Sequence, residues 1–314
     1  MCTCNGERYL AQQLDTLLHQ TYPIHEIIVQ DDHSTDATMA ILNDYAGRYG
    51  CIKVFQNDKR LGVNGNFFSA MSRATGEYIA ISDQDDLWEP KKIEHQMNCI
   101  GNNLLCACRS IPFSTDGLPV AYDPRRPNVH LMRLLYSSIP GHTMLFHRRL
   151  LALLPPPDDT LLTYYDVYLS LTAAAYGGLV LTDEFLVHQR RHEQAVTYVP
   201  ADPRRSPSVG NALYILLWSL RHFRQVHPHQ CRYFQRRLRL MEGIKSDSKL
   251  FHDALLIIWL QSQEGLIPLL HLTYWHVKYR HYLFYTEGHG VVNLCRALLN
   301  SLMQTYNYRY LVGL

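Results

Sequence analysis

The sequence lacks a strong excess of charge of either sign. Its 314 residues include 30 Lys and Arg against 28 Asp and Glu, which gives a formal net charge of +2. Such a chain creates no global field that would attract an acidic polymer, so nucleic acid is not an expected partner. Any specific partner must be recognised by local groups.

Long apolar runs are also absent. The longest, residues 212–220 and 254–260, fall well short of the roughly 20 residues that a helix needs to span a bilayer. The N-terminus shows no basic segment followed by an apolar stretch, the pattern of a secretory signal. We expect a cytoplasmic protein and leave open a peripheral attachment to the inner membrane face.

The eight cysteines are too sparse and irregular for the disulfide framework of a small secreted domain. They fit a reducing compartment better. Neither Cys-x-Cys pair has the spacing of a structural zinc site.

Two common phosphate-binding motifs are missing. No Gly-x-Gly-x-x-Gly or Gly-x-x-x-x-Gly-Lys pattern follows an expected strand. This counts against two alternatives on a similar sheet, a nucleotidyltransferase and a dinucleotide-dependent oxidoreductase, without removing them.

What the sequence does contain is an α/β pattern. Over the first hundred residues, β-like runs at 26–30, 52–55 and 78–82 alternate with apolar residues at helical spacing, which predicts a mostly parallel sheet flanked by helices. A helix is expected over 165–175, and the segment 201–207, rich in proline and arginine, predicts a linker. We therefore expect an α/β domain over residues 1–200 and a helical C-terminal region over residues 201–314.

Acidic clusters stand at the ends of two expected strands. Asp31-Asp32 follows the first, and Asp83-Gln84-Asp85-Asp86 follows another. Ligands of open α/β sheets bind beyond the carboxyl ends of the strands. Neighbouring carboxylates repel unless a cation neutralises them, and oxygen ligands suit Mg²⁺ or Mn²⁺. The other interpretation of the run 83–86 is a solvated turn.

Short motifs in a fixed order match one known family. They are Thr3-Cys4-Asn5-Gly6, Gln30-Asp31-Asp32-His33-Ser34, Leu61-Gly62, Ser82-Asp83-Gln84-Asp85-Asp86, Gly141-His142-Thr143, Tyr165-Asp166-Val167 and Gln189-Arg190-Arg191-His192. With them the chain resembles the family 2 inverting glycosyltransferases of the GT-A fold, most closely rhamnosyltransferase-like enzymes of surface polysaccharide synthesis. The resemblance covers roughly residues 1–195.

The resemblance implies a role for each matching residue. Asp166 would be the catalytic base, and Asp85 and His192 would bind the Mg²⁺ or Mn²⁺ ion. The residues that would bind the nucleotide-sugar donor are Thr3, Asn5, Asp31, Asp32, Asp83 and Arg190. The acceptor would be a hydroxyl of a saccharide or of a lipid-linked saccharide.

Asp166 also has a purely structural interpretation. It stands between aromatic residues at the start of an expected helix, where partial desolvation would raise its pKa toward the range useful for a general base. The same position would suit a helix N-cap.

The chain departs from the family pattern at its start. A full apolar strand normally precedes the Thr-x-Asn-Gly turn, whereas here the turn comes almost at once, and Cys4 occupies a position usual for tyrosine. We expect a truncated first strand, either because the true start lies upstream or because this is a damaged copy. The alternative function is thus a truncated, non-catalytic relative that binds nucleotide weakly or not at all.

The C-terminal region is basic and aromatic. Between Pro203 and Met241 there is no acidic residue, while arginines recur among Trp218, Phe223 and Tyr233. A basic amphipathic helix of this kind can lie on an anionic membrane surface or bind nucleic acid. The alternative is a packed helical appendage with a solvated arginine face.

Overall fold

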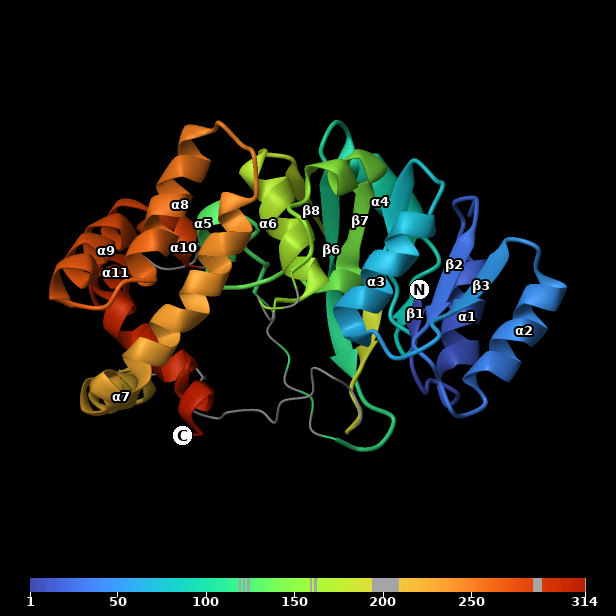
Figure 1. The fold of residues 1–314 in the computed structure, drawn as a ribbon, viewed down its shortest axis with the longest axis horizontal. Coiled ribbons are helices and arrows are strands. Elements are labelled where there is room, and N and C mark those ends of the chain that lie inside the picture. Colours follow the sequence, from blue (N-terminus) through green and yellow to red (C-terminus); the bar gives the residue numbers. More distant parts are fainter. Residues whose placement is uncertain are drawn as a thin grey trace.

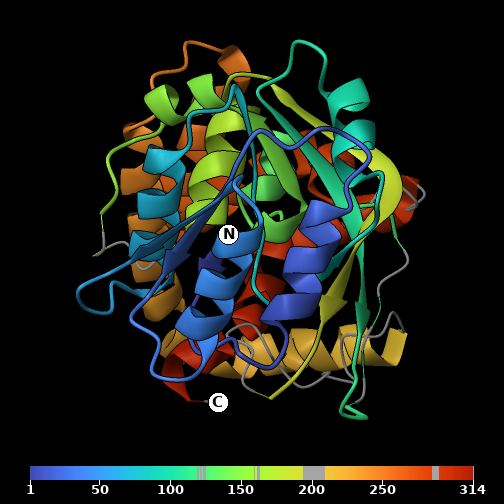
Figure 2. The same cartoon turned by 90° about the vertical axis from the view of Figure 1, so that its right-hand side faces the viewer.

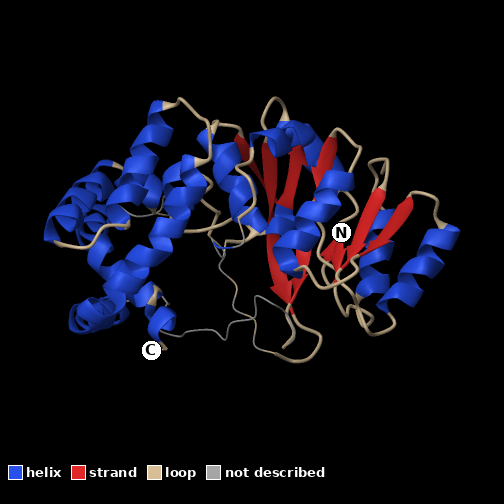
Figure 3. Ribbon diagram, viewed as in Figure 1, coloured by secondary structure: helices blue, strands red, loops and turns tan. Residues whose placement is uncertain are grey.

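The computed structural model describes residues 1–118, 120, 122, 125–158, 160, 163–193, 209–284 and 290–313. Sheets flanked by helices form one side of the molecule, and a group of helices forms the other (Figures 1 and 3). In the described chain every strand lies within residues 2–190, and the helical region begins at Val209. The proposed boundary at residue 200 and the expected linker at 201–207 fall outside the described residues.

The first sheet is parallel, as predicted. It has the order β1 (Cys2–Thr3), β2 (Ile27–Asp31), β3 (Ile52–Gln56), and helices α1 (Leu10–Leu18) and α2 (Thr38–Arg48) connect its strands. Every residue of β2 is buried, which is typical of a strand covered on both faces. The buried leucines of α1 and α2 pack in one cluster with Ile27 and Val29.

The second sheet is mixed rather than parallel. Its order is β4 (Tyr78–Ala80), β7 (Met144–His147), β6 (Leu105–Phe113), β8 (Leu179–Arg190), β5 (Leu87–Trp88), and only β6 and β8 run parallel. Around it lie α3 (Gly62–Arg73), α4 (Lys92–Ile100), the short α5 (Leu131–Leu134) and α6 (Tyr165–Ala175). The expectation of a mostly parallel sheet therefore holds for β1–β3 alone, because a short apolar run does not specify the direction of its neighbours.

The first strand is short, as expected. β1 pairs with β2 over two residues, and Cys2 N donates to Ser82 O at 3.3 Å just beyond β4. Next to Met1 an apolar cavity of about 350 Å³ lies between β2 and β4, lined among others by Ile28, Phe67 and Ile79. The two sheets thus meet at β1, and the cavity separates them beside Met1.

The helical region packs directly on the α/β part. It comprises α7 (Val209–Glu242), α8 (Lys249–Gln261), α9 (Leu266–Lys278), α10 (Arg280–Leu283) and α11 (Gly290–Asn307). Tyr136 Oη lies 2.7 Å from Nε2 of His276, and Ser246 Oγ donates to Ala175 O at 2.7 Å. Burial lowers the pKa of His276 to about 3, so this imidazole stays neutral. Nowhere in the described chain does a helix combine the length and apolarity needed to cross a bilayer.

Candidate active site

The buried carboxylate of Asp31, at the end of β2, accepts hydrogen bonds from other residues of this chain. It accepts hydrogen bonds from Thr3 Oγ1 (2.8 Å), Ser34 N (2.8 Å) and Gln56 Nε2 (3.2 Å). The predicted donor-binding residues Thr3 and Asp31 therefore bond to each other and fix the turn that follows β2.

Asp32, also buried, holds the start of α3. Its oxygens accept from Leu61 N at 2.7 Å, Gly62 N at 2.9 Å and Asn57 Nδ2 at 2.9 Å. The first N–H groups of a helix lack intrahelical partners, and a negative charge is favourable there. The carboxylate of Asp32 thus positions the loop at the edge of the crevice.

Asn5 joins the N-terminal turn to the loop after β2. Its φ of 50° is left-handed, a conformation that Asn tolerates, and its Oδ1 accepts from Thr35 N at 2.9 Å. A Cβ on the next residue, Gly6, would lie 2.3 Å from Oε1 of Gln84, so a larger residue there would displace the Gln84 amide from its bonds to the backbone of Cys4. The turn is therefore held between the two acidic loops.

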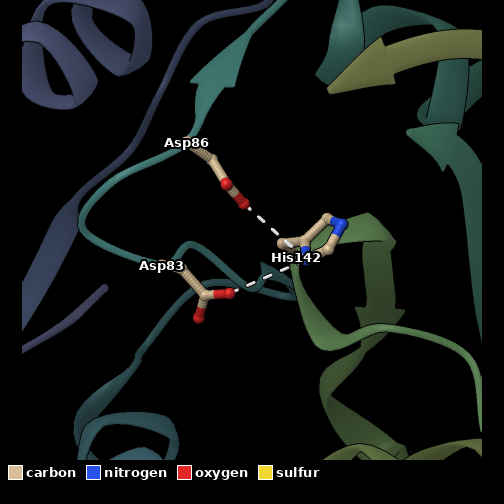
Figure 4. Close-up of side chains that lie close together, drawn as sticks. All are labelled: Asp83, Asp86 and His142. Atoms are coloured by element: carbon tan, nitrogen blue, oxygen red, sulfur yellow. Dashed lines mark ion pairs between the residues drawn. The ribbon is translucent and has the colours of Figure 1, made fainter. Parts of the chain in front are cut away.

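The second acidic loop faces a histidine from a distant part of the chain. Nδ1 of His142 lies 3.7 Å from Oδ2 of Asp83 and 3.6 Å from Oδ2 of Asp86 (Figure 4). His142 stands in the 3₁₀ turn η1 (Gly141–Thr143) directly before β7. Three potential metal-ligating atoms, one from each residue, lie within 4.8 Å of one another.

Burial controls the charges in this group. It raises the pKa of Asp86 to about 7, while the nearby His142 acts in the opposite direction. Burial would lower the pKa of His142, but the carboxylates of Asp86 and Asp83 outweigh it and raise that pKa. Among the described residues, neither Oδ2 of Asp86 nor Nε2 of His142 finds a hydrogen-bond partner. Such buried polar atoms normally have partners, so the group suits a bound cation or another ligand.

The predicted metal ligands Asp85 and His192 lie side by side. Nε2 of His192 is 2.8 Å from Oδ2 of Asp85, and the imidazole packs on the ring of Tyr9 at a centroid distance of 5.1 Å. Burial and the neighbouring Asp83 raise the pKa of Asp85, against the effect of His192. The structure therefore brings together two residues that are 107 positions apart in the sequence.

Arg190, at the end of β8, fixes the acidic loop to the second sheet. Its backbone N donates to Oδ1 of Asp86 at 3.0 Å and its Nε to the backbone O of Asp85 at 2.8 Å. The guanidinium lies 4.4 Å from the ring centroid of Tyr9 and 4.7 Å from that of Phe113. It is buried, and its positive charge stands beside the carboxylates of the loop.

Asp166 lies in the first turn of α6 but is not its N-cap, which is Tyr164. Its Oδ1 accepts from Val167 N at 2.8 Å. Burial, helped by the charge of Asp83, raises the pKa of Asp166 to about 6, although the bond from Val167 N and the charge of Arg237 act against the shift. A carboxylate with this pKa is suited to take a proton near neutral pH.

Close packing brings Asp166 to the group of Asp83, Asp86 and His142. A Cβ at Gly141 would lie 2.1 Å from Oη of Tyr165, so only glycine fits between His142 and the start of α6. Tyr165 in turn stacks on Phe67 at 3.9 Å, and its N–H donates to Oδ1 of Asn64 at 2.9 Å. Helix α3 thereby holds the first turn of α6 against the acidic loop.

Sequence reasoning gave no role to three of these residues. Asp86 was part of the acidic run, His142 belongs to the motif Gly141-His142-Thr143, and Asn64 lies two residues after the motif Leu61-Gly62. The unpartnered atoms of Asp86 and His142 are tertiary features that no local pattern contains. A histidine between glycine and threonine directly before an apolar strand was the only available signal.

The donor atoms of the site fit a hard divalent cation. Asp83, Asp85 and Asp86 offer carboxylate oxygens, and His142 and His192 add imidazole nitrogens. Oxygen-rich sets of this kind suit Mg²⁺ and Mn²⁺, and an imidazole is better tolerated by Mn²⁺. The residues present thus agree with the predicted cofactor without selecting one ion.

The N-terminal half of the chain matches a known protein family. Residues 1–152 match the family model described as glycosyl transferase family 2. Similar proteins include Bacillus subtilis EpsE, named as a glycosyltransferase, at 44% identity over 96 residues that make up 30% of this chain and 34% of EpsE. B. subtilis TuaG, named as a teichuronic acid biosynthesis glycosyltransferase, is 34% identical over 93 residues, 30% of this chain and 37% of TuaG. Over residues 1–152 the chain is therefore similar to glycosyltransferase family 2.

Longer matches are weaker. An uncharacterized protein of Mycobacterium tuberculosis is 28% identical over 217 residues, 64% of this chain and 60% of the relative. The chain therefore spans between about a third and three fifths of the length of these relatives.

Solved structures show the same fold. TarS residues 1–349 from S. aureus superposes with a TM-score of 0.57 at 16% identity, covering 98% of this chain and 90% of that one. Longer TarS coordinates give a TM-score of 0.53 at 18% identity over 95% of this chain and 53% of that one. The fold is that of the GT-A glycosyltransferases, as predicted.

Proposed function

We propose that this protein transfers a hexosyl group from a nucleoside diphosphate donor to a hydroxyl acceptor, with inversion at the anomeric carbon. The observation that carries the proposal is the placement of Asp166 beside the acidic loop. The Gly141–Tyr165 contact fixes this placement, and burial raises the pKa of Asp166 to about 6. TarS, which shares the fold, is described in complex with UDP-GlcNAc, which supports a nucleotide sugar as donor.

In this proposal Asp166 is the general base. It takes the proton of the acceptor hydroxyl as that oxygen attacks the anomeric carbon from the face opposite the leaving diphosphate. The bond from Val167 N limits the rotation of the carboxylate. One oxygen, Oδ1, is engaged by that bond, which leaves Oδ2 for the proton.

The donor would lie along the edge formed by the two acidic loops. Thr3, Asn5, Asp31, Asp32 and Asp83 would shape the nucleoside end of the site, and Arg190 would add positive charge toward the diphosphate. Asp85 and His192 would hold Mg²⁺ or Mn²⁺, with the group of Asp83, Asp86 and His142 as the second candidate ligand set. When bound, the cation would neutralise charge on the departing nucleoside diphosphate.

Surface polysaccharide synthesis is the proposed setting, because TuaG is named for teichuronic acid biosynthesis. The acceptor would then be a saccharide or a lipid-linked saccharide at the cytoplasmic side of the membrane. Both the acceptor and the location are part of the proposal.

A transfer assay tests the function directly. The purified chain is incubated with radiolabelled UDP-, GDP- and dTDP-sugars, with Mn²⁺, Mg²⁺ or EDTA, and with membrane extracts as the source of acceptor. We expect transfer or slow hydrolysis of one donor with a metal and none in EDTA. A folded protein that neither binds nor turns over any donor would contradict the proposal and favour a non-catalytic relative.

A further inference from the structure

Three helices of the C-terminal region expose rows of large apolar side chains. Leu266 is 74% exposed, and Val291 is 75% exposed. The full set, which we call the apolar surface, comprises Leu213, Leu217 and Leu220 on α7, Leu266, Ile267, Leu270 and Tyr274 on α9, and Val291, Val292, Leu294, Leu298 and Leu299 on α11. Spacings of three and four residues within each row place its members on one side of their helix.

The three helices are neighbours. On α7, Trp218 packs edge-on against Tyr306 of α11 at 5.2 Å, and on α9, Oγ1 of Thr273 lies 3.2 Å from Oγ of Ser301 of α11. They lie at the end of the molecule away from β1–β3, and the first half of α7 crosses the base of the molecule before the helix changes direction (Figures 1 and 2). Pro228 lies inside this helix. Rows of exposed apolar side chains on adjacent helices expose a larger apolar area than single surface leucines do. Large exposed apolar patches mark interaction sites.

Basic residues outnumber acidic ones in the helical region that carries the apolar surface. In the described part of the helical region the acidic residues are Glu242, Asp247, Asp253 and Glu264, against twelve Lys and Arg. Helices α9 and α11 contain no acidic residue. Arg221 and Arg224 continue the leucine row of α7 at helical spacing, and Arg296 stands between the rows of α11; all three are exposed.

We propose that the apolar surface docks on an anionic lipid bilayer. Leucine, isoleucine and valine side chains would enter the boundary between headgroups and acyl chains, and the flanking arginines would meet anionic headgroups. Arg side chains are long enough to keep their guanidinium in the headgroup layer while their stems lie along apolar surface. The protein would lie on the membrane without crossing it.

A second copy of the chain is a poorer occupant. Pairing the apolar surface with itself would bring Arg221, Arg224 and Arg296 of two copies into one interface, and like charges oppose such an interface. An anionic bilayer instead complements both the apolar rows and the arginines. The docking surface goes beyond the proposed transfer reaction, because its argument uses no residue of the active site.

Vesicle binding tests the surface without donor or acceptor. The full chain is mixed with sucrose-loaded vesicles of phosphatidylcholine containing phosphatidylglycerol, and bound protein is measured by sedimentation. We expect binding that rises with the anionic lipid fraction, falls with added salt, and is at least about tenfold weaker on pure phosphatidylcholine.

Variants separate docking from folding. Ile267→Glu with Leu270→Glu changes two exposed side chains of α9 and should reduce binding by about tenfold or more with an unchanged melting temperature. The double change Arg221→Glu with Arg224→Glu should remove most of the salt-sensitive part of the binding to anionic vesicles. Tyr49→Glu is the matched control, since Tyr49 is an exposed aromatic residue at the end of α2, on the opposite side of the molecule (Figure 1).

Several results would overturn the proposal. One is that the folded chain does not bind anionic vesicles. Another is that the α9 variant binds them as well as the unchanged chain does. A third is that the chain forms a dimer without lipid and that the α9 variant is a monomer. The last would assign the surface to a second copy. Because vesicle binding needs no turnover, an inactive chain that still binds would refute the reaction alone, and an active chain that does not bind would refute the surface alone.

Discussion

His192 Nε2 lies 2.8 Å from Asp85 Oδ2, which joins the residues just after β8 to the loop after β4 across 107 positions of sequence. The backbone N of Arg190 holds the adjacent Asp86 at 3.0 Å. The end of strand β8 and the acidic loop therefore form one unit, and a ligand that binds one of them also meets the other.

The first prediction concerns Asp85. A nucleoside diphosphate should raise the free energy of unfolding of the chain only when Mn²⁺ or Mg²⁺ is present, by about 2.7 kcal/mol at a ligand concentration near 100 times its Kd, and the melting temperature should rise accordingly. Asp85→Ala should remove this stabilisation. Differential scanning fluorimetry with and without EDTA measures it, and a full shift in EDTA would exclude the metal role.

A second prediction separates the two candidate ligand sets. If Asp85 and His192 hold the ion, His192→Ala should weaken Mn²⁺ binding by roughly 10- to 100-fold, while His142→Ala should have a smaller effect. Isothermal titration with Mn²⁺ in the presence of nucleoside diphosphate gives both values. The reverse order would assign the ion to Asp83, Asp86 and His142.

Asp166→Asn should abolish transfer while donor binding remains. Asn keeps the size of the side chain and an acceptor for Val167 N, but it cannot take the proton of the acceptor hydroxyl, and loss of a general base lowers rates by about 10²- to 10⁴-fold. Asp247→Asn, at an exposed acid between α7 and α8, is the control and should retain full activity. Near-normal transfer by Asp166→Asn would return Asp166 to a structural role.

The pKa of Asp166 predicts a pH dependence. Its ordinary value of 3.8 is raised to about 6, so the ionised base forms only as the pH passes 6. Transfer should rise about tenfold per pH unit below that value and level off above it. A pH profile already flat between 5 and 8 would contradict the assignment.

The same shift has a consequence for stability. The folded chain binds the proton of Asp166 more tightly than the unfolded chain, so stability from this group is lost as the pH rises from about 4 to 6. Asp166→Asn should therefore gain about 1–3 kcal/mol at pH 7 and almost nothing at pH 4. Urea unfolding at the two pH values measures the difference, and equal gains would refute the raised pKa.

Gly141→Ala tests the packing that places the base. The added Cβ would lie 2.1 Å from Oη of Tyr165, so the start of α6 must shift. We expect a loss of about 1–3 kcal/mol of stability together with transfer activity. Gly47→Ala in α2 is the matched control, because no atom lies within 4 Å of its Cβ, and it should gain up to about 1 kcal/mol. Full activity of Gly141→Ala would show that this contact does not position Asp166.

The sequence by itself determined the elements and the places of the acids. The expected strand at 26–30 is β2 (Ile27–Asp31), and the expected helix at 165–175 is α6. Asp31, expected just after the first strand, is its last residue, and Asp83 comes shortly after β4. These features can be predicted because the spacing of apolar residues, and the polar residues at the end of a strand, lie within a short stretch of the sequence.

Only the tertiary structure decided the directions of the strands and the partners of the side chains. In the structure the second sheet is mixed, and the carboxylates of Asp31 and Asp32 accept hydrogen bonds from other residues of this chain. His142 lies next to the acidic loop. The tertiary structure also places Asp166 within the first turn of α6 rather than at its N-cap. Contacts between residues so far apart depend on how whole elements pack, and no local pattern in the sequence encodes that packing.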